Sequence, residues 1–157
     1  MSKPERRSVR YSHLDEAVDD VRQLASRGYD RAGTWSLEQN LNHLNKTMRL
    51  AFEPVEWRLP RLIRPILRWL LLGRMERRGS RALPRSAKAP LWLQPDEGLA
   101  LAPQITEFER LTGLIESPDA ELTSHHPVFG RLNRRQWQIV QRWHCAHHLS
   151  HLRPRAG

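Results

Sequence analysis

Hydrophobic residues recur at spacings of three and four in three segments of the chain, near residues 11–27, 36–50 and 103–117. This spacing places them on one face of an α-helix, where they can pack into a core. The residues concerned are Leu14, Val18, Val21 and Leu24 in the first segment, Leu37, Leu41, Leu44 and Met48 in the second, and Ile105, Phe108, Leu111 and Ile115 in the third. The pattern therefore predicts three amphipathic helices.

Capping signals give the start of two helices. Ser36 and Asn133 are each followed three residues later by a glutamine, the spacing of a capping box. We expect the helix after Asn133 to be the last one and to run to about Leu152, before Pro154 stops it. The chain shows no internal repeat and no convincing strand pattern.

The middle of the chain is less regular. Its prolines are Pro54, Pro60, Pro65, Pro84, Pro90 and Pro95. A helix from about 65 to 77 is compatible with them, because proline is accepted in a first turn. Residues 79–98 are expected to form an extended loop, and loops of that length tend to be functional. The prediction is one all-α domain over residues 1–157: a bundle of four long helices with an irregular, Pro-rich and basic insertion at about 54–102.

The net charge of +9 is confined to part of this insertion. Residues 58–88 hold ten basic residues and one acid, Glu76, whereas the rest of the chain is balanced. Arg61, Arg64 and Arg68 fall on one side of the expected helix, and the apolar residues fall on the other. We expect the apolar side to pack on the bundle and the arginines to face water. Two prolines interrupt this stretch and it matches no nucleic-acid-binding motif, so neither nucleic acid nor a membrane is the expected partner.

Several features indicate a cytoplasmic protein. The charged N-terminal residues are followed by no apolar leader segment. The longest apolar run, residues 69–73, is far shorter than the roughly 20 residues that span a bilayer. The single cysteine, Cys145, excludes an internal disulfide and is expected to be buried and inert.

Four of the eight histidines lie close together near the end of the chain. On a helix, His144, His148 and His151 fall within about 60° of one another, on the stripe that faces the core. Residues at i and i+4 have Cβ atoms about 5–6 Å apart, so two imidazoles can converge on one ion. His147 lies on the shoulder of this stripe.

One helix cannot supply a complete site. His43 is the only histidine inside the second predicted helix and is the candidate third ligand. Three histidines with open positions are typical of a catalytic metal centre. The alternative is a set of core histidines that are only hydrogen-bonded. No HExxH motif is present, which excludes a zincin protease.

Four further residues have open roles. His125 and His126 precede the last helix and can serve the turn or the site. Trp35 and Trp137 are expected in the core, with lining of the pocket as the alternative.

Two parts of the sequence carry a family resemblance. The run Gly33–Leu37 leading to His43, with a terminal His-x-x-x-His helix, resembles the DinB-like metal-binding four-helix bundles. The stretch His126–Leu132, followed by Trp137 and by 144–149, is similar to an uncharacterised domain-of-unknown-function branch of that superfamily. The resemblance is faint between residues 53 and 102.

The resemblance implies an up-up-down-down bundle with metal ligands on the second and last helices, here His43, His144 and His148. His151 stands where many relatives carry glutamine, which implies an outer partner or an extra ligand. Relatives bind one divalent ion such as zinc or nickel, and some transfer low-molecular-weight thiols or act as thiol-dependent isomerases. We therefore expect a metal-dependent enzyme of thiol-transferase or hydrolase type.

The expected partner of such an enzyme is a small molecule, for example an anionic thiol that the arginines of residues 58–88 would bind, and a homodimer is compatible with the fold. The alternative is a non-catalytic binding protein on the same fold that interacts through the basic face of residues 58–88.

Overall fold

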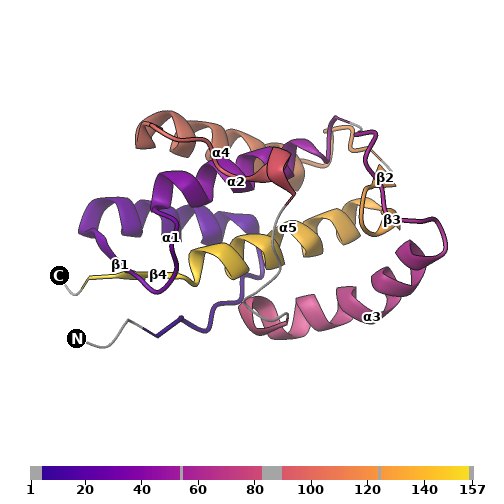
Figure 1. Cartoon of the computed structure of the whole chain (residues 1–157), viewed down its shortest axis with the longest axis horizontal. Coiled ribbons are helices and arrows are strands. Elements are labelled where there is room, and N and C mark those ends of the chain that lie inside the picture. Colours follow the sequence, from indigo (N-terminus) through magenta and orange to yellow (C-terminus); the bar gives the residue numbers. More distant parts are fainter. Residues whose placement is uncertain (1–4, 54, 83–89, 124, 156–157) are drawn as a thin grey trace.

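The computed structural model describes residues 5–53, 55–82, 90–123 and 125–155. Within these ranges the chain is mainly helical (Figure 1). The helices are α1 (Leu14–Arg27), α2 (Leu37–Arg49), α3 (Ile63–Arg78), α4 (Leu101–Glu116) and α5 (Arg134–Leu149), with short 3-10 turns η1 (Gly79–Arg81) and η2 (Leu91–Leu93). The three helices predicted from the hydrophobic spacing are confirmed.

Both predicted capping boxes are present. The Ser36 hydroxyl accepts a hydrogen bond from the Gln39 amide, and the Gln39 side chain accepts one from the Ser36 amide at 3.0 Å. Asn133 starts α5 in the same way. These bonds satisfy amide groups that the first turn of a helix leaves unpaired, and they fix where α2 and α5 begin.

The apolar faces of four helices meet in one core. Helix α2 packs against α4, α1 packs against α4 and α5, and α2 also contacts α5. The largest fully buried side chains include Trp137, Phe108, Leu24, Leu41, Leu44, Leu111, Ile115 and Leu149. Helix α3 packs chiefly on α5 and lies at the lower edge of the view in Figure 1.

The expectation of a chain without strands is wrong. Strand β1 (Tyr29–Arg31) pairs antiparallel with β4 (Leu152–Pro154), and β2 (His125–His126) pairs with β3 (Gly130–Arg131). Pairs this short leave no alternating pattern in the sequence. Strand β4 also explains why the last helix ends at Leu149 and not near Leu152, because these residues bond to β1 instead of continuing α5.

The predicted orientation of the basic helix is wrong in part: Leu67 packs against the core and Arg61 is exposed, as expected, but other residues of its apolar side lie in water. Leu62, Ile66 and Trp69 on its apolar side are 83%, 56% and 80% exposed. Arg68 is turned inward and donates a hydrogen bond to the Arg131 carbonyl, while the Arg64 side chain lies against Gly130. The aliphatic stem of Arg64 thus covers Gly130 of β3, a role that the charge pattern alone does not reveal.

The C-terminal half of α3 packs on the core through the buried side chains of Leu72 and Met75. The large hydrophobic side chains that are exposed in the described ranges all lie between residues 57 and 92: Trp57, Leu62, Ile63, Ile66, Trp69, Leu70, Leu91 and Trp92. Part of the predicted loop at 79–98, residues 83–89, lies outside the described residues. No helix in the described ranges is long and apolar enough to cross a membrane.

Because Leu62 is exposed and Leu72 is buried, aspartate should have different effects on stability at these two positions. Leu62→Asp should change the free energy of unfolding by less than about 0.5 kcal/mol, because the side chain is already in water. Leu72→Asp should cost about 3 kcal/mol or more, because it buries a carboxylate on α5. Urea unfolding followed by circular dichroism measures both. Equal losses would show that the apolar side of α3 is packed in solution.

Candidate metal centre

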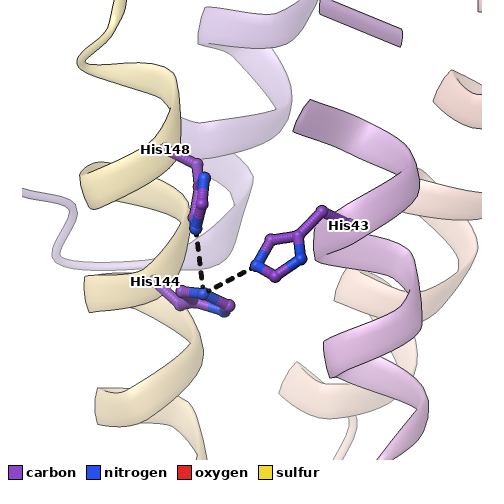
Figure 2. Close-up of side chains that lie close together, drawn as sticks. All are labelled: His43, His144 and His148. Atoms are coloured by element: carbon purple, nitrogen blue, oxygen red, sulfur yellow. Dashed lines mark hydrogen bonds between the residues drawn. The ribbon is translucent and has the colours of Figure 1, made fainter. Parts of the chain in front are cut away.

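Helices α2 and α5 bring His43, His144 and His148 together. The Nε2 atom of His144 lies 3.2 Å from Nε2 of His43 and 3.1 Å from Nε2 of His148. One ligand atom from each of the three rings lies within 4.8 Å of the others. Figure 2 shows the rings pointing toward one another from the two helices. The three residues singled out in the sequence therefore share one site that could bind a metal ion.

The backbone of the middle segment fixes the tautomer of His43. Nδ1 of His43 lies 2.6 Å from the Leu93 carbonyl oxygen in η2. A carbonyl oxygen can only accept, so Nδ1 carries the proton and donates it. In the neutral ring Nε2 then presents a lone pair toward His144.

A hydroxyl group fixes the tautomer of His144, again with the proton on Nδ1. Oγ1 of Thr47 donates its single proton to the Leu44 carbonyl at 2.9 Å and lies 3.1 Å from Nδ1 of His144. The hydroxyl oxygen therefore accepts from Nδ1, and Nε2 of His144 is left with a lone pair.

Two acceptors thus face each other at 3.2 Å, an arrangement that two neutral imidazoles cannot satisfy by themselves. A bound cation satisfies both. Histidine nitrogens lie about 2.0–2.1 Å from zinc, which separates two ligand atoms by about 2.9–3.4 Å at angles between 90° and 109°. The donor set and its spacing therefore fit a divalent ion.

Burial keeps all three rings in the neutral form that coordinates metals. Burial lowers the pKa of His43, and nearby Lys46 adds to this, although the hydrogen bond to Leu93 opposes it. Burial followed by the neighbouring histidines holds the pKa of His144 and His148 well below the ordinary value. An ion would not have to compete with protons near neutral pH.

Two tryptophans stack on the histidines. The Trp35 ring lies parallel to His148, with centroids 5.5 Å apart, and Trp143 lies against His144 at 5.6 Å. Stacking restricts the rotation of both imidazoles. Trp35 therefore lines the site, whereas Trp137 is fully buried and donates from Nε1 to the Thr123 carbonyl at 2.7 Å.

The three histidines border a cavity of about 300 Å³. Its wall is mainly apolar and includes Leu50, Leu71, Met75, Val128 and Val140 together with the aromatic rings of Trp35, Trp57, Trp92, Phe129 and Trp143. A metal ion at the histidines would therefore face a space large enough for a small molecule.

Two further histidines line this cavity. Nδ1 of His126 accepts hydrogen bonds from the amides of Val128 and Phe129, at 3.0 and 3.2 Å. His126 thus shapes the turn and also lines the cavity, so both open roles apply. Nδ1 of His147 accepts from the Arg6 guanidinium at 3.0 Å. Each ring therefore carries its proton on Nε2.

Burial lowers the pKa of His126 and His147 to about 3, with Arg6 contributing at His147. Both rings are neutral donors at physiological pH. The position of His147 on the shoulder of the helical stripe did not indicate that it lines the cavity, and its contact with Arg6, 141 positions away, has no signal in the sequence.

The remaining candidate residues lie outside the cluster. His151 follows the end of α5, and its ring centroid is 5.7 Å from that of His147. The prediction that it shares the helical stripe of His144 and His148 is wrong, because the helix ends before it. His125 is exposed in β2. Cys145 is buried as expected, and burial raises the pKa of its thiol.

Fold and site together define a mainly helical protein with a three-histidine cluster at the base of an apolar cavity. The chain belongs to the family described as a protein of unknown function, DUF1569, whose model matches residues 3–155. Neither the curated proteins nor the solved structures contain a match to it.

The buried neutral state of His126 predicts a pH dependence of stability. Below the ordinary pKa of 6.5 the unfolded chain takes up a proton, whereas the folded one does so only near pH 3. The free energy of unfolding must therefore fall as the pH falls through this window. The His126→Asn variant keeps an acceptor for the two amides and removes this titration. Between pH 7 and pH 5 its free energy of unfolding should therefore fall by about 2 kcal/mol less than that of the wild type. Urea titrations at both pH values measure this, and equal losses would contradict a neutral His126.

Proposed function

We propose that the protein is a DinB-like metal-binding protein whose His43, His144 and His148 hold one divalent ion, zinc or nickel, and that it is a metal-dependent enzyme. Under this proposal α1, α2, α4 and α5 form the up-up-down-down bundle, and α3 is an addition to it. The observation that carries the proposal is the pair of facing Nε2 acceptors on His43 and His144.

The chain itself supplies the arrangement that such an ion needs. The Leu93 carbonyl and the Thr47 hydroxyl orient two imidazoles through their Nδ1 atoms, as outer partners commonly do for metal-bound histidines. Three protein ligands leave positions open for water or substrate. A divalent ion there would lower the pKa of a bound water or thiol.

Hydrolysis and thiol transfer both suit this centre. Each needs a nucleophile that is ionised near neutral pH, and each needs groups that hold the second reactant. The Nε2–H donors of His126 and His147 line the same cavity and would hydrogen-bond an oxygen atom of the ligand.

A second candidate function rests on a different observation. The exposed apolar side of α3, with Leu62 and Trp69 in water, suits a non-catalytic protein that binds a partner through residues 58–88. One variant distinguishes the two candidate functions: Trp69→Ala would weaken binding of the partner and leave metal binding unchanged.

The proposal predicts about one divalent ion per chain in protein purified without a histidine tag. His43→Ala, His144→Ala and His148→Ala should each lower metal affinity more than about 100-fold, since each removes a ligand. Thr47→Val should cost about 10-fold, because it removes only the partner that orients His144. Elemental analysis and competition with a chelating dye measure both quantities.

Two histidines serve as controls. His13→Ala and His125→Ala should leave the affinity unchanged, because both side chains are exposed and outside the cluster. His151→Ala should have a smaller effect than loss of a ligand, since its ring contacts His147. Protein that takes up no zinc or nickel, with its fold intact by circular dichroism, would refute the proposal.

A further inference from the structure

The wall of the cavity beside the three histidines carries no charged side chain among the residues that the structure describes. In particular, none of the arginines between residues 58 and 82 lines it, although Leu71 and Met75 of α3 do. The arginines that the structure describes between residues 58 and 82 therefore lie away from the wall of this cavity.

The polar groups of the wall are neutral. His126 and His147 donate from Nε2, and Gln141, which is 1% exposed, donates from Nε2 to the Thr47 carbonyl at 3.4 Å. Since these groups carry no charge, they cannot compensate an ammonium group, or a carboxylate held away from the metal ion, that enters the cavity. Moving such a group out of water without a partner is costly.

Aromatic rings line a large part of the remaining wall. Trp57 and Trp92 contact each other, with centroids 6.4 Å apart, and are 45% and 42% exposed. Trp35 and Trp143 lie deeper, stacked on the histidines. The cavity therefore offers flat apolar surfaces both where it meets solvent and beside the expected ion.

From this lining we infer the ligand class of the centre: a small molecule with one metal-binding donor and an otherwise uncharged, apolar, preferably aromatic body. The inference rests on the proposed function, because the donor needs the ion. Three neutral imidazoles leave the charge of the ion uncompensated, so the ion itself attracts the donor atom. Ligands with additional charged groups, such as thiols carrying several carboxylates, are disfavoured.

The size of the cavity agrees with this class. An apolar cavity of about 150 Å³ takes up one benzene molecule. The 300 Å³ found here holds a donor group together with one substituted ring. Burying a phenyl ring typically improves affinity by about tenfold or more.

Four probes that share one donor and differ only in the body test the inference. They are 1-methylimidazole, 1-phenylimidazole, 4-(imidazol-1-yl)benzoate and 4-(imidazol-1-yl)benzylamine, whose para charges cannot reach the ion that the ring nitrogen binds. Binding to cobalt-loaded protein is read from the visible absorption of the metal. We expect 1-phenylimidazole to bind about tenfold tighter than each of the other three. Tighter binding of the benzoate or the benzylamine would overturn the inference.

A matched pair of tryptophan variants locates the effect. Trp92→Ala should reduce the advantage of 1-phenylimidazole over 1-methylimidazole about threefold or more, because it removes part of the wall. Trp69→Ala removes an equally large exposed ring outside the cavity and should leave the ratio unchanged. A ratio that Trp92→Ala does not alter would contradict binding in this cavity.

The same titrations on metal-free protein, followed by tryptophan fluorescence, separate this inference from the proposed function. A protein that binds no cobalt refutes the metal centre, but the preference for the phenyl body must still appear in the metal-free titration. Metal binding without that preference refutes the ligand class alone.

Discussion

The contact between Nε2 of His43 and Nε2 of His144 is the constraint around which the structure is arranged. Two lone pairs are held 3.2 Å apart because both Nδ1 protons are committed elsewhere, to Leu93 and to Thr47. The two partners come from different elements, because Leu93 belongs to η2 and Thr47 belongs to α2. The packing around the two rings holds them in this geometry, as is common where a fold prepares a binding site.

The described arginines of α3 lie away from the cavity that the three histidines border. Arg68 bonds to the Arg131 backbone, and Arg64 lies against Gly130, whereas Leu71 and Met75 face the cavity. Helix α3 thus lines the cavity with Leu71 and Met75, whereas Ile66 and Trp69 of the same helix are left in water.

The helices and the pair of His144 and His148 could be predicted because their signals are local. A spacing of three and four identifies a buried face, and the i, i+4 spacing of His144 and His148 places two imidazoles on one side of a helix. The partners that complete the site could not be predicted. Leu93 acts through its carbonyl, which any residue possesses, and Arg6 reaches His147 across 141 positions of the sequence. The orientation of α3 could not be predicted in full for a similar reason. An amphipathic pattern identifies two sides of a helix, but it does not show which side a neighbouring element covers.

Binding of a metal ion at this cluster would be coupled to the stability of the fold. Every buried neutral histidine lowers the stability of the folded chain in acid, because the unfolded chain gains a proton that the folded one resists. His43, His144 and His148 all have pKa values lowered by burial, so their burial costs stability as the pH falls below the ordinary histidine value of 6.5 and costs little at neutral pH. An ion that bound the folded chain alone would add stability, by an amount that grows with its concentration relative to its dissociation constant. Under the proposed function, the ion would therefore offset in acid the cost of burying three neutral imidazoles, until protons displaced it from its ligands.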